Sequence, residues 1–282
     1  MTYRLTFQIV LILLVACTSA FAQTGRSILG VKLKPELAAI VTEIEKKCGR
    51  KLYAEFTPQD QFTLGSSFVD EDMLPVVLVD PQYEESEKLE AIIIHELLHL
   101  RLRVNNYPVF VFSPSVNTQQ GRAIDVEQEN LRDFKSILDH HVFKADMVRY
   151  GLDKLVDLAG DTARDAKRRR GRESSNADII NYARAILEYP NQKDIVEVTR
   201  IYTENGWTRD LKAGKEIADI ISRSVIKTPA DYERVMLQCL PKLYPIPADR
   251  YAFKLTVDPG NKVFRQMIVS VSKRPARKAR QK

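Results

Sequence analysis

The spacing of apolar residues in the first half of the chain predicts helices and short strands. Apolar positions at helical spacing predict a helix over residues 35–47, which begins at a proline and stops before a glycine. Short apolar runs predict strands over 52–56 and 74–79. The next helix, over 84–104, is apolar on most of its faces, so we expect it at the centre of its domain.

The second half of the chain has a different pattern. A helix over 124–150, with a kink allowed, is followed by shorter amphipathic helices. We place these at 177–188, 192–205, 210–223 and 229–240. Two runs, 251–257 and 263–271, flank a turn sequence and predict a β-hairpin. The expected fold is therefore α+β, with a small sheet first and a mainly helical region that ends in a hairpin.

The N-terminus has the composition of a secretory signal peptide. Arg4 precedes an uncharged, apolar run that ends in small residues at Ala22. This pattern predicts cleavage after Ala22 and an exported protein, periplasmic or secreted. Two alternatives would attach the protein to a membrane. The run could remain as an uncleaved anchor, or Cys17, within a sequence that resembles a lipoprotein lipobox, could become the acylated first residue.

Changes in composition divide the chain into segments. We expect a signal peptide over 1–22, a first domain over 23–160, a basic linker over 161–175, a helical region over 176–272 and a disordered basic tail over 273–282. Within the linker, the basic residues 164–172 fit either a solvated connection or the end of a helix.

Cleavage of the signal leaves two cysteines, Cys48 and Cys239. In an oxidising compartment they could form a disulfide, but lone cysteines in apolar surroundings are as often buried thiols. The sequence does not decide between these two states.

The positive charge is concentrated in two places. The 282 residues carry a net charge of +6, while residues 164–172 alone carry +5 and residues 273–282 carry +6. The rest of the chain is therefore acidic, and residues 70–90 carry −7. Neither basic stretch interleaves aromatic residues with its charges, as a binder of single-stranded nucleic acid does. We expect no nucleic-acid partner.

The central helix contains the sequence His95-Glu96-Leu97-Leu98-His99. Residues four apart share one face of a helix, so both imidazoles can reach the same metal ion. Glu96 lies one position further round, where it can act on a water bound to that ion. Nitrogen ligands with one carboxylate and an open fourth position favour one Zn²⁺ ion. Without a metal, this helix would have to bury three polar side chains at a free-energy cost.

Residues 92–100 resemble the active-site helix of the zincin metallopeptidases, and the strand–helix order before them resembles the minimal zincin core. The resemblance covers residues 35–150 and implies a zincin-like catalytic domain over 23–160. Arg101 departs from it, because zincins usually continue with an apolar residue. The glycine and third histidine of the metzincins are absent after His99. This implies a gluzincin-like site, completed by a carboxylate from a later helix.

Helical geometry ranks the candidates for the third ligand. The apolar stripe of the helix over 124–150 runs through Leu131, Phe134, Leu138 and Val142, and Glu127 falls on that stripe. We expect Glu127 to bind the metal, although a first-turn carboxylate favoured by the helix dipole explains it equally well. Other candidates are Glu129, Asp133, Asp139, His140 and His141. Glu129 and His140 lie on roughly the opposite side and Asp139 to one flank. Glu129 is the second choice, while Asp139 and His140 could take part instead if the helix kinks.

The motif and the resemblance together predict an exported zinc metallopeptidase. It would hydrolyse peptide bonds of a peptide or protein through a zinc-bound water activated by Glu96. His141 could stabilise the oxyanion or serve only a structural role, and Tyr107 and Tyr150 are further candidates for that position. The alternative is a catalytically inactive zincin-like module of the cell envelope that binds metal or a partner.

Overall fold

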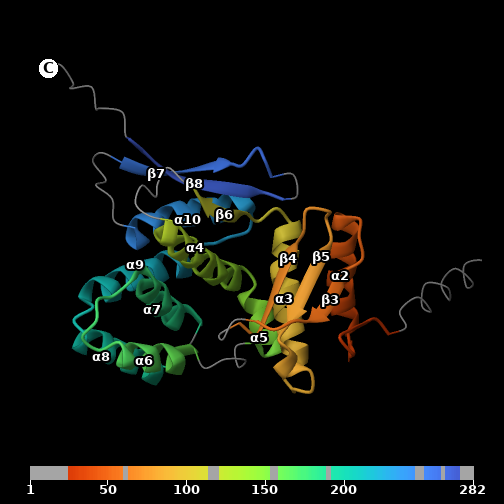
Figure 1. Ribbon diagram of the computed structural model, residues 1–282, viewed down its shortest axis with the longest axis horizontal. Helices are drawn as coiled ribbons and strands as arrows, with labels where there is room; N and C mark the ends of the chain where they lie inside the picture. Colours follow the sequence, from red (N-terminus) through yellow and green to blue (C-terminus); the bar gives the residue numbers. More distant parts are fainter. Residues whose placement is uncertain are drawn as a thin grey trace, which may run out of the picture. The chain divides into compact units, whose positions relative to one another are not determined.

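The computed structural model describes residues 25–59, 63–113, 121–152, 158–188, 192–244, 251–261 and 264–273. These residues form an α+β structure with two units, residues 1–101 and residues 102–282 (Figure 1). The division lies within the helix that carries the two histidines, which differs from the sequence-based boundary at residue 160. The expected signal peptide, with Cys17 and Ala22, and the tail from residue 274 lie outside the described residues.

Unit 1 is built from short strands and two long helices. Its elements are β1 (Ser27–Ile28), β2 (Val31–Lys32), α2 (Pro35–Cys48), β3 (Tyr53–Phe56), β4 (Gly65–Val69), β5 (Pro75–Val79), the short 3-10 helix η1 (Pro81–Tyr83) and α3 (Leu89–Val104), whose last turn belongs to unit 2. Strands β1 and β2 form an antiparallel pair. The main sheet has the order β3-β5-β4, with β3 parallel and β4 antiparallel to β5.

Local sequence signals explain most boundaries in unit 1. Helix α2 begins at Pro35 and is closed by Gly49, whose φ of 68° is readily adopted only by a residue without a Cβ. Strand β5 is central and buries Val76, Val77 and Val79, which gives the continuous apolar run seen in the sequence. Helix α3 begins at Leu89, later than expected, because the preceding residues form η1 and turns.

Unit 2 is mainly helical and ends in a second sheet. Its elements after α3 are β6 (Val109–Phe112), α4 (Gly121–Val142), α5 (Lys144–Tyr150), α6 (Leu158–Arg168), α7 (Asn176–Glu188), α8 (Gln192–Glu204), α9 (Thr208–Ser222), α10 (Pro229–Leu243), β7 (Tyr251–Val257) and β8 (Gln266–Lys273). The predicted hairpin is present as the antiparallel pair β7 and β8, and β6 adds to β8 in parallel. The kink that the sequence allowed in the helix over 124–150 falls at Phe143, between α4 and α5.

The segment that we expected to be a solvated linker, residues 161–175, is largely structured. Helix α6 covers its first half, and Ala163 and Ala166 are buried against α7 and α8. Arg169 donates to Asp178, whose side chain is fully buried. Of the two interpretations of residues 164–172, the structure has the helix end, and basic residues on the solvent side accompany a short apolar face.

Cys48 and Cys239 are free thiols, and both are buried. Burial raises the pKa of Cys48, and it raises the pKa of Cys239 to about 12. Of the two states that the sequence left open, the structure has the buried thiols.

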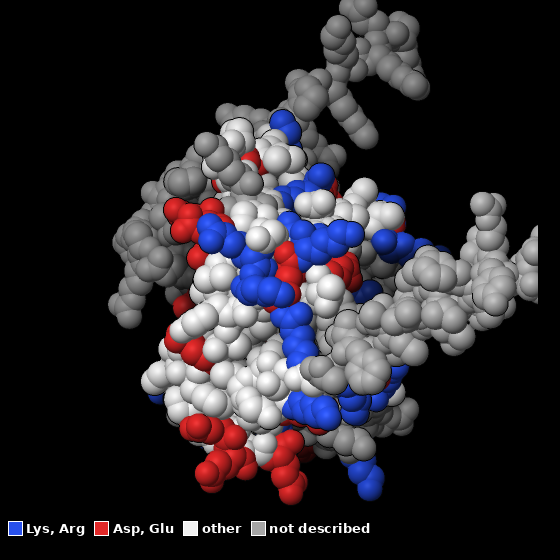
Figure 2. Space-filling view, turned by 90° about the vertical axis from the view of Figure 1, so that its right-hand side faces the viewer, with Lys and Arg blue, Asp and Glu red and all other residues white. Residues whose placement is uncertain are grey.

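Charges of both signs occur together on the surface of the described residues. The face in Figure 2 carries Lys and Arg side chains next to Asp and Glu side chains. Ion pairs in unit 1 follow the same pattern, with Lys47 and Arg101 both beside Glu43. Among the residues that the structure describes, no helix is both long enough and apolar enough to cross a membrane.

Candidate metal centre

Helix α3 places His95 and His99 next to each other. Its apolar residues Ile92, Ile93 and Leu97 are almost fully buried, which fixes the rotation of the helix and leaves both histidines partly exposed. The two imidazole rings pack edge to face, with 4.6 Å between their centroids. The sequence prediction that both rings share one face of the helix is therefore confirmed.

Glu96 lies beneath this histidine pair and is only 6% exposed. The Nδ1 atom of His95 lies 2.9 Å from its Oε1, and the Ser67 hydroxyl donates to its Oε2 at 2.8 Å. Burial alone would raise the pKa of Glu96, but the hydrogen bond and charge of His95 outweigh it, with smaller contributions from His99 and Ser67. The net pKa is lowered, so Glu96 is a buried carboxylate. When His95 donates from Nδ1, its Nε2 lone pair is left for a metal.

Strand β4 approaches helix α3 closely at Gly65. A Cβ atom at this position would lie 2.9 Å from the carbonyl oxygen of Leu78 and 3.0 Å from Cγ2 of Ile92. It would also lie 3.4 Å from Cγ of Glu96. The glycine thus lets the strand that carries Ser67 pack directly over Glu96. Neither β4 nor Ser67 was expected from the sequence, because Gly-Ser-Ser lacks the apolar alternation of a strand.

In unit 2, helix α4 holds His140 in a buried position. Its Nδ1 atom lies 2.8 Å from Oε1 of Glu188 at the end of α7, and its Nε2 lies 3.3 Å from the hydroxyl of Ser136. We expected His140 on roughly the opposite side of the helix from the apolar stripe. That side is instead covered by α7, where Arg184 donates to the carbonyl oxygen of Asp133.

The other candidates on α4 have different surroundings. Leu131, Phe134 and Leu138 of the predicted stripe are fully buried, as expected. Glu127 lies in α4, but its side chain falls outside the described part of the structure. Glu129 is exposed and Asp133 is half-buried. Asp139 is buried, forms an ion pair with Lys135 and accepts a hydrogen bond from the hydroxyl of Tyr232 at 2.7 Å.

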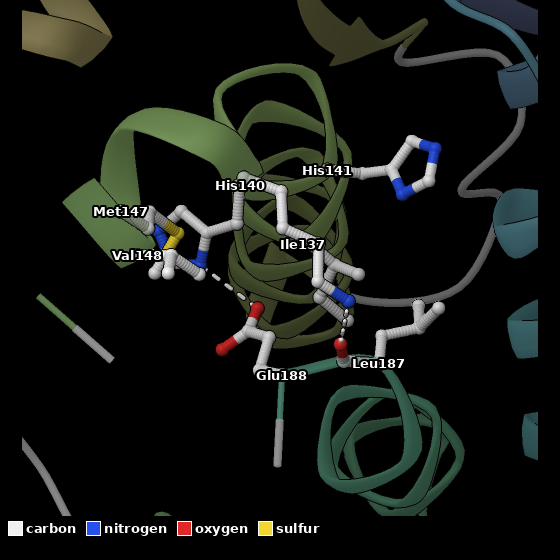
Figure 3. Close-up of a pocket in the computed structure, with 8 residues that line it drawn as sticks. Ile137, His140, His141, Met147, Val148, Leu187 and Glu188 are labelled. Carbon is white, nitrogen blue, oxygen red and sulfur yellow. Dashed lines mark hydrogen bonds and ion pairs between the residues drawn. The ribbon is translucent and has the colours of Figure 1, made fainter. Parts of the chain in front are cut away.

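The three residues considered for the oxyanion have structural contacts. His141 lies 3.2 Å through Nε2 from the carbonyl oxygen of Ser224, and its ring is directed away from the His140–Glu188 pair (Figure 3). Tyr107 is buried and packs edge to face on Tyr232. Tyr150 is half-buried, with the Arg149 guanidinium over its ring.

A pocket opens beside His140, between α4, α5 and α7. It has a volume of about 140 Å³, and Ile137, Met147, Val148 and Leu187 give it apolar walls. Figure 3 shows the His140–Glu188 pair at its edge. Lys144, which also lines the pocket, donates from Nζ to the carbonyl oxygen of Leu187 at 3.1 Å.

Unit 1 therefore carries a histidine pair with a buried carboxylate on α3, and unit 2 carries a buried histidine on α4 with its own carboxylate on α7. No protein-family description, curated protein or solved structure matches the chain.

Proposed function

We propose that this chain is a zinc-dependent metallopeptidase in which His95, His99 and His140 bind the metal. The observation that carries the proposal is the paired imidazoles of α3 above the buried carboxylate of Glu96. Three neutral histidines that leave a position open are a ligand set used by catalytic zinc. In both His95 and His140, Nδ1 faces a carboxylate, which leaves Nε2 for the ion.

The continuity of α3 supports His140 as the third ligand in place of Glu127. Arg103 lies one turn beyond His99 on the same face of this unbroken helix. Burial lowers the pKa of Arg103, and the charge of Asp139 on α4 opposes that effect. The last turn of α3 thus carries a half-buried cation whose charge interacts with that of Asp139, and His140 is the next residue of α4.

Glu96 is the group that moves the proton in this proposal. A bound zinc ion lowers the pKa of a coordinated water and polarises a carbonyl group. The carboxylate of Glu96 accepts the proton from the attacking water and returns it to the leaving amine. Because the Ser67 hydroxyl donates to Oε2, we assign the proton transfer to Oε1, which would give up its hydrogen bond with His95 when it accepts the proton of the water.

Strand β4 supports a peptide as the substrate. It lies at the edge of its sheet, and among the described residues only β5 pairs with it. An extended peptide can add to such an edge through main-chain hydrogen bonds. Because Ser67 of β4 contacts Glu96, a peptide bound along this strand would pass next to the catalytic carboxylate.

The engagement of Glu96 also supports a second candidate function. Its two oxygens are occupied by His95 and Ser67, as in a site that binds metal without turnover. The chain would then be an inactive zincin-like module. Both candidates retain export, proposed from the N-terminal sequence, as their setting.

Metal analysis of the purified protein tests the ligand set. We expect one zinc ion per chain, loss of that ion in His95→Ala and weaker binding with incomplete occupancy in His140→Ala. Glu129→Gln, on the exposed side of α4, is the matched control and keeps the ion. Full zinc occupancy in His140→Ala would remove His140 from the site, and full occupancy in His95→Ala would refute the site itself.

A further inference from the structure

Glu188, the last residue of α7, is a buried carboxylate directed at His140. Its side chain is 7% exposed, that of His140 is 10% exposed, and 48 residues separate them in the sequence. Figure 3 shows the pair joined across the space between α4 and α7. Removing a carboxylate from water costs free energy, so a buried one requires partners that offset this cost.

The end of α7 is held close to α4 and α5. On this helix, Nε of Arg184 lies 3.8 Å from Oε1 of Glu188, and the same guanidinium donates through Nη2 to the carbonyl oxygen of Asp133 on α4. Next to Glu188, the carbonyl of Leu187 accepts from Lys144 of α5. These contacts attach the end of α7 to both α4 and α5 and so keep the backbone of Glu188 near His140.

The pair also determines which nitrogen of His140 carries the proton. A carboxylate 2.8 Å from Nδ1 stabilises the tautomer with hydrogen on that atom. The lone pair then lies on Nε2, which has the Ser136 hydroxyl 3.3 Å away. A carboxylate that accepts from a metal-binding histidine fixes the ring and makes it a more basic ligand.

From these contacts we infer that Glu188 is a positioning residue for His140, and that the helical region beyond residue 176 sets the zinc affinity through it. The inference rests on the proposed function, in which His140 binds the metal. It gives the helical region a role in the site, which the sequence left open.

A double-mutant cycle in the full chain tests this role. Glu188→Gln keeps the size of the side chain and removes its charge. We expect it to weaken zinc binding by about 10–100-fold, measured by competition with a chelator of known affinity. In a His140→Ala background the same substitution should change the affinity no further, because residues that act as a unit are not additive. Glu197→Gln, an exposed carboxylate on α8, is the matched control and leaves the affinity unchanged.

The outcomes separate the positioning role from the ligand set. If Glu188→Gln binds zinc as tightly as the wild type while His140→Ala binds weakly, the ligand set stands and the positioning role is wrong. Equal weakening by Glu188→Gln in both backgrounds would show a general structural effect and also refute the role. If His140→Ala keeps the wild-type affinity, the ligand set itself fails. Should the Glu188→Gln substitution prevent folding, Glu188→Asp replaces it in the same cycle and is judged by the same criteria.

Discussion

Replacing Asp178 with asparagine removes the negative charge that neutralises Arg169 inside unit 2. Asp178 is fully buried and accepts from both terminal nitrogens of Arg169, one of them at 3.0 Å. It also accepts the backbone N–H of Ser175 at 2.7 Å and the Ser175 hydroxyl at 3.1 Å. The Arg169 guanidinium in turn lies over the ring of Trp207, with 4.9 Å to its centroid. The substitution therefore affects the start of α7 and the core that contains Trp207.

The magnitude follows from the burial of the two partners. Breaking a buried ion pair by removing one charge costs about 3–5 kcal/mol. The Arg169 side chain is 24% exposed, so water can compensate part of its charge. We therefore expect the lower end, about 3 kcal/mol. For a unit of this size, that corresponds to a fall in melting temperature of roughly 6–12 °C.

The assay is thermal unfolding followed by circular dichroism, supported by chemical denaturation. The matched control is Glu197→Gln on α8, whose ion pair with Arg200 is exposed on both sides. Exposed pairs contribute little, so the control should melt close to the wild type. If Asp178→Asn also melts within about 2 °C of the wild type, the Arg169–Asp178 pair does not hold this part of the fold and our reasoning is wrong.

Two further predictions concern unit 1. Gly65→Ala should destabilise it by about 1–3 kcal/mol in chemical denaturation, because the new Cβ overlaps the carbonyl of Leu78; unchanged stability would contradict the close packing at β4. Burial raises the pKa of Glu45, but the hydrogen bonds from Arg26 and from the backbone N–H of Leu52 together lower it by more, so the net pKa in the folded state is below its ordinary value. The ionised Glu45 therefore stabilises the fold at neutral pH, and this contribution is lost as the pH falls through its folded-state pKa. Glu45→Gln should be less stable than the wild type at pH 7 and as stable as the wild type in acid. An equal difference in denaturation midpoint at both pH values would refute the assigned cause.

The part of the site carried by one helix could be predicted from the sequence. A spacing of four residues is enough to place His95 and His99 on one face, and the apolar residues around them indicate burial. Helix α2 could be bounded in the same way, from its proline and its glycine. These signals are local, so they do not depend on how distant segments pack.

The partners of the site could not be predicted, because they come from distant segments. Ser67 reaches Glu96 only because Gly65 lets β4 lie close to α3. The spacing of apolar residues in the sequence does not predict that contact. His140 was placed opposite the apolar stripe of its helix, and the helix that covers this side, α7, follows much later in the chain. Tertiary packing thus decided which residues face the core.

The segment over 161–175 shows where prediction from composition alone fails. Its many basic residues suggested a solvated linker, and they outweighed the two alanines that face the core. A readable signal was nevertheless present. Ser175 and Asp178 have the spacing of a capping box, in which the third residue of a helix bonds back to the residue before its start. This spacing marks the beginning of α7.

The most direct measurement of the central claim is peptide cleavage by the wild type and by Glu96→Gln at matched zinc content. Glu90→Gln, in the first turn of the same helix, is the control for loss of a carboxylate. We predict that the wild type and the control cleave a peptide library and that a chelator stops them. Glu96→Gln should bind zinc with the same stoichiometry and cleave nothing. Cleavage by Glu96→Gln at the wild-type rate would contradict the account, and so would a zinc-loaded wild type that cleaves no peptide.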